Sequence, residues 1–91
     1  LPKSLSMLRI DADNVMLETV KKAEKSDEIV VRLYEFQNKR TNVNVAFFGE
    51  LEAVSECDLL ENDIDSVVAQ GSTFSFEIKP YEIKTFKLKV K

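Results

Sequence analysis

Carboxylates are the most numerous side chains in this sequence that could do chemistry. There are 16 aspartates and glutamates, against one cysteine and no histidine. A pair of carboxyl groups held about 5–10 Å apart can hydrolyse a glycosidic bond. Glu35 and Glu82 are two candidates, because each directly follows a tyrosine. A catalytic role also needs a concave pocket with orienting groups, which a small domain seldom builds alone. We therefore expect structural or surface roles for both.

An acidic stretch in the second half of the chain suggests a cation site. Its members are Glu56, Asp58, Glu61, Asp63 and Asp65. An EF-hand loop needs glycine at its sixth position and glutamate at its twelfth. Counting from Asp58 puts Asp63 and then an alanine at those positions, so the template fails. We expect a solvated acidic loop.

The single cysteine, Cys57, is a weak candidate nucleophile. The absence of histidine excludes Ser-His and Cys-His pairs as well as H-E-x-x-H metal sites. The neighbouring carboxylates of Glu56 and Asp58 would raise the pKa of the thiol. We expect Cys57 to be a small core or sheet residue, with no internal disulfide.

Five aromatic residues could form a platform on which sugar rings stack: Tyr34, Phe36, Phe48, Tyr81 and Phe86. The chain has no tryptophan, and most of these rings fall at alternating positions that favour burial. We expect them in the core.

Composition narrows the possible partners. A net charge of -3 is the wrong sign for an electrostatic nucleic-acid binder. No apolar run approaches the ~20 residues of a membrane-spanning helix. A hydrophobic fraction of 44% with 32% charged residues is typical of a globular chain. We therefore expect neither nucleic acid nor membrane as a partner.

Alternation of apolar and polar residues predicts strands along most of the chain. The clearest lies at 73–79, with apolar residues at 74, 76 and 78, after a turn at 70–72. A final strand at 83–90 places Phe86, Leu88 and Val90 on one face. Its lysines form the other face, which we interpret as a solvent face that guards a possible sheet edge.

Further strands are predicted at 5–10, 29–36, 42–47, 53–57 and 66–69. The strand at 29–36 begins apolar on both faces, which favours a central position in a sheet. Residues 15–24 fit helical spacing as well as a strand, and we favour a strand because of the surrounding rhythm. The result is an all-β, antiparallel β-sandwich of about seven to eight strands, with residues 1–91 in one domain. The chain begins without methionine, so we expect it to be a fragment of a larger protein.

Four stretches in order resemble a known family. Residues 13–17 and 20–24 resemble the "ENV-x-L…LKKAE" opening of the last domain of family-38 glycoside hydrolases, the α-mannosidases. Residues 29–35 resemble that domain's "ILRLYE" strand. Residues 58–61 resemble its "NLLE", and residues 79–88 its closing "KPFEIKTLRL".

The resemblance implies an immunoglobulin-like C-terminal β-sandwich of a much larger retaining enzyme. The catalytic carboxylates and zinc ligands of that family lie in other domains, so we transfer no catalytic or metal residue to this chain. Zinc is expected only in the parent enzyme. The implied role is an accessory domain that packs against the remaining domains and supports them. Arg32, Tyr34 and Glu35 are candidates for contact with another domain or with substrate. Their structural alternative is a set of cross-strand ion pairs made by Arg32 and Glu35.

Two alternatives stay open, a stand-alone carbohydrate-binding module for mannosides and a protein-interaction module. The presence of only one cysteine, without a visible signal sequence, leads us to expect a cytoplasmic location.

Overall fold

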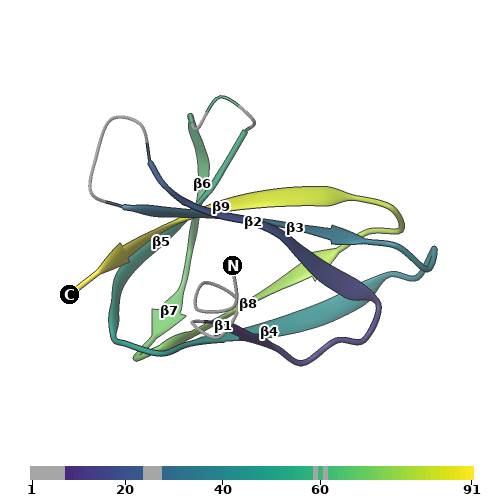
Figure 1. Ribbon diagram of the computed structural model, residues 1–91, viewed down its shortest axis with the longest axis horizontal. Coiled ribbons are helices and arrows are strands. Elements are labelled where there is room, and N and C mark those ends of the chain that lie inside the picture. The colour runs from purple at the N-terminus through teal and green to yellow at the C-terminus, as the bar shows by residue number, and fades with distance from the viewer. Residues whose placement is uncertain (1–7, 24–27, 59, 61) are drawn as a thin grey trace.

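Two antiparallel sheets face each other in the computed structural model, which describes residues 8–23, 28–58, 60 and 62–91 (Figure 1). The four-stranded sheet has the order β1-β4-β8-β7 and the five-stranded sheet the order β2-β3-β9-β5-β6. Within the described residues the strands are β1 (Leu8–Ile10), β2 (Val15–Lys22), β3 (Ile29–Glu35), β4 (Thr41–Phe47), β5 (Leu51–Cys57), β6 (Asp63–Val67), β7 (Ala69–Gln70), β8 (Thr73–Ile78) and β9 (Ile83–Val90). The predicted antiparallel β-sandwich is confirmed. The predicted strand at 66–69 is wrong, because the chain leaves β6 at Val67 and enters β7 in the opposite sheet.

The core lies between the two sheets and is built from the apolar members of each alternating pattern. Phe86 of β9 and Phe74 of β8 meet across the sandwich, with ring centroids 5.3 Å apart. Both rings are buried, as is Leu33 of β3. The same alternation that predicted the strands therefore supplies the two inner faces.

The ambiguous segment predicted at 15–24 forms a strand from Val15 to Lys22, and residue 24 lies outside the described residues. β2 pairs with β3 from Val15 to Lys22, with a register shift between Leu17 and Thr19. Periodicity alone did not separate strand from helix here. The segment forms a strand because the backbone of β3 supplies hydrogen-bond partners for the backbone of β2.

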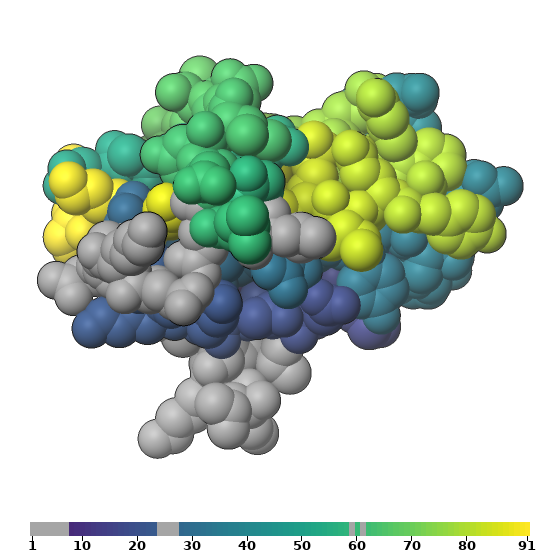
Figure 2. All heavy atoms as spheres, turned by 90° about the horizontal axis from the view of Figure 1, so that it is seen from above, coloured from purple at the N-terminus to yellow at the C-terminus, as the bar shows by residue number. Residues whose placement is uncertain are grey.

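β9 corrects the interpretation of the lysine pattern. It lies between β3 and β5, in the middle of the five-stranded sheet, and does not guard an edge. Lys84 and Lys87 are mostly buried along their stems, and their ammonium groups reach Glu56 (3.0 Å) and Asp63 (3.1 Å). Alternation indicates which face a side chain occupies, but it does not show which strands lie on either side. In the view of Figure 2, β6 (green) lies beside β9 (yellow), although β6 is the edge strand of this sheet and pairs with β5.

The central position predicted for β3 is confirmed. β3 lies between β2 and β9, and both Val30 and Val31 are fully buried although they point to opposite faces. The turn predicted at 70–72 is also confirmed. Gly71 has a φ of 65°, and Gln70 pairs with Thr73 across it. No helix in the described part of the chain is long and apolar enough to span a membrane.

Candidate functional site: an exposed aromatic surface over a buried carboxylate

An exposed apolar surface lies on the outer face of the five-stranded sheet. We call it the aromatic surface and define it as Met16, Tyr34, Phe36, Tyr81 and Ile83. The register of the sheet pairs Met16 with Tyr34 and Tyr34 with Ile83, so three neighbouring strands place these side chains side by side. Four of the five are strongly exposed, at 48% for Met16, 39% for Phe36, 65% for Tyr81 and 55% for Ile83.

These side chains line a shallow depression of about 580 Å³ together with Leu17, Glu18 and Glu35. The Tyr34 hydroxyl donates to the Met16 sulfur at 3.3 Å. The rings of Tyr34 and Phe36 meet edge to face, with centroids 6.3 Å apart. The surface is thus an apolar patch whose side chains hold one another in place.

The three residues predicted as contacts lie on β3 but occupy both of its faces. Tyr34 belongs to the aromatic surface. Arg32 shares the outer face, where it lies 3.7 Å from the Glu18 carboxylate and donates to the Thr85 hydroxyl at 3.3 Å. Glu35 is only 1% exposed and points inward. Arg32 therefore makes a cross-strand ion pair, with Glu18 of β2, whereas the Glu35 carboxylate accepts hydrogen bonds from Asn14 and from backbone N–H groups. Only Arg32 and Tyr34 are accessible from outside.

The Glu35 carboxylate lies at the centre of a buried hydrogen-bond network at one end of the sandwich. One oxygen, Oε2, accepts from the Asn14 side-chain amide at 2.8 Å and from the backbone N–H groups of Gln37 (2.9 Å) and Lys39 (3.1 Å). The other, Oε1, accepts from the backbone N–H of Tyr81 at 2.8 Å. One side chain thus joins the β1–β2 connection, the β3–β4 turn and the β8–β9 turn.

Neutral donors keep this carboxylate charged. Burial alone would raise the pKa of Glu35, because it disfavours the ionised form. The hydrogen bonds from the Tyr81 backbone, the Asn14 side chain, and the Gln37 and Lys39 backbones outweigh that effect. Together they lower the pKa of Glu35 from 4.5 to about 2. Glu35 is therefore a poor general acid and a strong structural acceptor.

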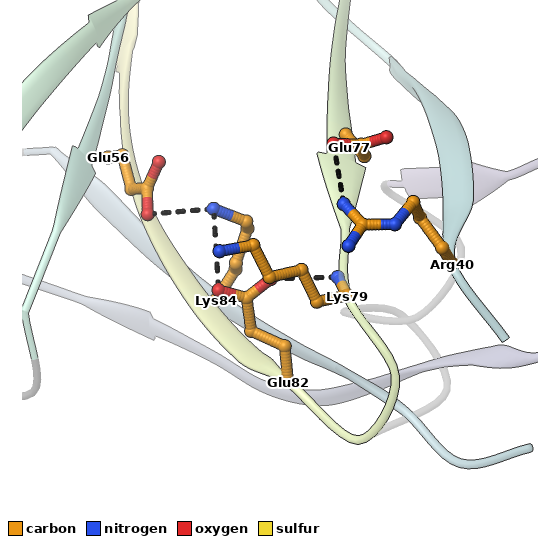
Figure 3. Close-up of polar contacts among 6 residues, drawn as sticks. All are labelled: Arg40, Glu56, Glu77, Lys79, Glu82 and Lys84. Atoms are coloured by element: carbon orange, nitrogen blue, oxygen red, sulfur yellow. Dashed lines mark hydrogen bonds and ion pairs between the residues drawn. The ribbon is translucent and has the colours of Figure 1, made fainter. Parts of the chain in front are cut away.

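The Glu35 network also fixes the position of Tyr81. Tyr81 has a φ of 59°, a left-handed conformation that is rare for an aromatic residue. Its turn is closed by the Glu82 N–H donating to the Lys79 carbonyl at 3.0 Å and the Lys79 N–H donating to a Glu82 carboxylate oxygen at 2.8 Å (Figure 3). The Tyr81 N–H is held by Glu35, while the ring stays in solvent.

Among the described residues, the other candidates from the sequence do not form a catalytic or metal site. Glu35 is enclosed by its donors, so it cannot act with Glu82 as a pair of catalytic carboxylates. Cys57 is buried, as expected for a sheet residue. Among the described residues no group of three or more histidine, cysteine, aspartate or glutamate side chains can hold a metal ion. Glu61 of the acidic stretch lies outside the described residues.

The prediction that the aromatic residues are buried is wrong for three of the five. Phe86 is fully buried, but Phe36, Phe48 and Tyr81 are exposed. Phe36 and Tyr81 follow the ends of strands, where the alternation no longer determines which way a side chain points. Asn14, which is buried and donates to Glu35, was not among the predicted site residues.

Comparison with known proteins adds a family assignment. None of the curated proteins matched. A family model described as "Glycosyl hydrolases family 38 C-terminal beta sandwich domain" matches residues 14–86, which is most of the chain and includes Asn14, Glu35 and Tyr81. The chain belongs to the family of glycosyl hydrolase family 38 C-terminal β-sandwich domains.

Proposed function

We propose that this chain is the non-catalytic C-terminal accessory domain of a family-38 α-mannosidase, in which it packs against the other domains and supports them. The observation that carries the proposal is the aromatic surface. Hydrolysis of mannosides would then belong to the other domains, and so would zinc. The chain has no histidine, and its described residues offer no group able to hold a metal, so they do not fit zinc.

The geometry of Tyr81 supports a docking role. A left-handed conformation costs a residue other than glycine roughly 1–2 kcal/mol. In this chain the Tyr81 ring recovers little of that cost, because the residue stays 65% exposed. Strained residues of this kind persist where the surrounding structure over-determines them, and they cluster at functional sites. A partner that buries the ring would explain why a tyrosine is kept there.

The composition of the aromatic surface points to a protein partner. Tyrosine, phenylalanine and methionine are enriched at the centres of protein interfaces, while charged residues lie at the rims. Here Arg32 and Glu18 form the polar rim as an ion pair, with the Arg32 Nη1 atom 3.7 Å from the Glu18 Oε1 atom. In this proposal the other domains of the same enzyme cover the surface.

Reconstitution in trans tests the docking. The rest of the enzyme, produced without these residues, would be immobilised and titrated with the 91-residue chain. We expect saturable binding, which the paired change Tyr81→Ser and Ile83→Thr abolishes. Phe48→Ser is the matched control, because Phe48 is as exposed (70%) but lies outside the aromatic surface. Equal binding by all variants would contradict docking through this surface.

An activity assay tests the non-catalytic part of the proposal. The purified chain, with or without added zinc, should not hydrolyse an aryl mannoside, while the longer enzyme should. Turnover by the pure chain would overturn the assignment of catalysis to other domains.

A carbohydrate-binding module is the second candidate, because Tyr34, Phe36 and Tyr81 line the 580 Å³ depression. It predicts saturable heat on titration with mannosides, weakened by Tyr34→Ala and by Tyr81→Ala. A flat titration at millimolar sugar would leave only the docking role for this surface.

A further inference from the structure

The outer edge of β8 is only partly paired. β7 covers two of its residues, pairing Ala69 with Phe74 and Gln70 with Thr73. β8 itself continues to Ile78 and pairs with β4 along that whole length. Among the described residues no strand pairs with the remaining stretch, residues 75–78, on the side away from β4.

Two residues direct backbone groups toward this open side. The Ser72 carbonyl accepts from the Phe47 N–H at 2.7 Å, so it points toward β4. In an antiparallel strand the N–H and C=O of one residue point to the same side, and the side alternates along the chain. Phe74, Phe76 and Ile78 therefore point toward β4. Ser75 and Glu77 direct their donors and acceptors outward.

A groove of about 440 Å³ runs along this edge. Five successive residues of β8, from Thr73 to Glu77, line the groove. Successive side chains of a strand point to opposite faces, so the groove follows the edge of β8 and not one face of the sheet. The facing wall is formed by residues 65–67 of β6 and by Val68, which follows them. Glu56 of β5 and Lys84 of β9 also line the groove, and Figure 3 shows their ion pair together with Glu77, which lies near Arg40.

The charged lining of the groove is mainly acidic. Three carboxylates line it, those of Glu56, Asp65 and Glu77, against the single ammonium group of Lys84. That ammonium is already bonded to Glu56 at 3.0 Å. Asp65 and Glu77 lie on the two opposite walls. Glu77 is itself paired with Arg40 at 3.2 Å, but Arg40 does not line the groove. The lining therefore keeps a surplus of negative charge, which favours a basic occupant.

The interior side of the edge is apolar. Phe76 is half-buried, and its ring lies 4.6 Å from that of Phe86 between the sheets. A strand placed beside β8 would direct alternate side chains inward toward Phe76 and outward toward solvent. The exposed length, residues 75–78, spans about 13 Å at the usual rise per residue.

We propose that an extended segment of a partner polypeptide, alternating apolar and basic residues, adds to the four-stranded sheet along β8. Its main chain bonds to Ser75 and Glu77, its apolar side chains cover Phe76, and its basic side chains meet Asp65 and Glu77. Main-chain bonding to a sheet edge with side-chain pockets for specificity is an established mode of peptide recognition. This site is separate from the aromatic surface and does not depend on the proposed role in an enzyme.

A synthetic peptide that alternates valine and lysine, with blocked ends, is the probe. We expect saturable NMR shift changes centred on the amides of residues 75–77. The Ser75 and Glu77 amides should exchange more slowly with solvent in the complex. A matched peptide with glutamate in place of lysine should bind more weakly. Absence of saturation, shifts centred on β2, or pairing of two copies of this chain along β8 would overturn the proposal.

Two sets of variants separate the main-chain and charge contributions. Ser75→Pro removes the outward N–H and should abolish binding, while Ser75→Ala should bind like the parent chain. The paired change Asp65→Asn and Glu77→Gln should weaken binding about fivefold, the size expected for an exposed ion pair. The control pair Glu50→Gln and Glu52→Gln alters charge outside the groove and should have no effect. If Ser75→Pro does not fold, the charge variants still test the proposal. Equal peptide affinities of the Asp65→Asn and Glu77→Gln chain and of the Glu50→Gln and Glu52→Gln chain would contradict it.

Discussion

Replacing Asn14 with alanine should destabilise the domain by about 2 kcal/mol. The Asn14 amide donates to a Glu35 carboxylate oxygen at 2.8 Å and to the Thr41 hydroxyl oxygen at 2.7 Å, and it lies 3.3 Å from the Lys39 carbonyl. Asn14 is 7% exposed, so water does not readily replace it. A hydrogen bond to a charged group contributes roughly 1.5–3 kcal/mol. The value of about 2 kcal/mol assumes that the bond to Glu35 accounts for most of the lost free energy of unfolding.

Urea unfolding at neutral pH measures this change. The Asn14→Ala midpoint should fall with an unchanged slope, and the thermal midpoint should fall by about 10 °C for a domain of this size. Asn42→Ala is the matched control, because Asn42 is an exposed asparagine on β4 and should change stability by less than about 0.5 kcal/mol. A loss no greater than that of the control would refute the view that Asn14 supports the Glu35 network.

Three further predictions concern the network, the core and a turn. Because the pKa of Glu35 falls from 4.5 to about 2 on folding, its stabilisation is present above pH 4.5 and is lost as the pH falls to about 2. The stability difference between the parent chain and Glu35→Gln should therefore shrink over that window in acid titrations followed by circular dichroism, and a pH-independent difference would contradict the assignment. Phe86→Ala should cost about 3–5 kcal/mol in urea unfolding, because Phe86 is fully buried between the sheets, and a loss below 1 kcal/mol would contradict its place in the core. Gly71→Ala should cost about 1 kcal/mol because of the φ of 65°, whereas Gly49→Ala should be nearly neutral; equal melting temperatures for the two would argue against a strained turn.

Most of the fold could be predicted from the alternation of apolar and polar residues along each strand. The apolar residues at 74 and 78 mark the inner face of β8, and those at 86 and 88 mark that of β9, because burial follows the period-two pattern of a strand. The same pattern did not place β9 in the middle of its sheet. Neighbours in a sheet are set by pairing between distant segments. The prediction that the lysines share one face was also wrong, because Lys84 lies on the same side of the sheet as Phe86, and Lys87 lies on the other.

The candidate site was only partly predictable. Tyr34 was identified as a contact residue and lies in the aromatic surface. The exposure of Phe36 and Tyr81 was missed, because turns set their direction. The role of Asn14 was missed as well, since it depends on a bond to a residue 21 positions away in the chain. A buried carboxylate held only by neutral donors leaves no local sign in the sequence.

The most direct test of the central claim is hydroxyl-radical labelling of the aromatic surface, read by mass spectrometry. The isolated chain would be compared with the longer enzyme purified from its source, with Phe48 as the internal reference for an exposed side chain. We expect labelling of Met16 and Tyr81 to fall sharply in the enzyme, while labelling of Phe48 does not. Equal labelling of Met16 and Tyr81 in both forms would contradict the proposal that this surface docks onto the other domains.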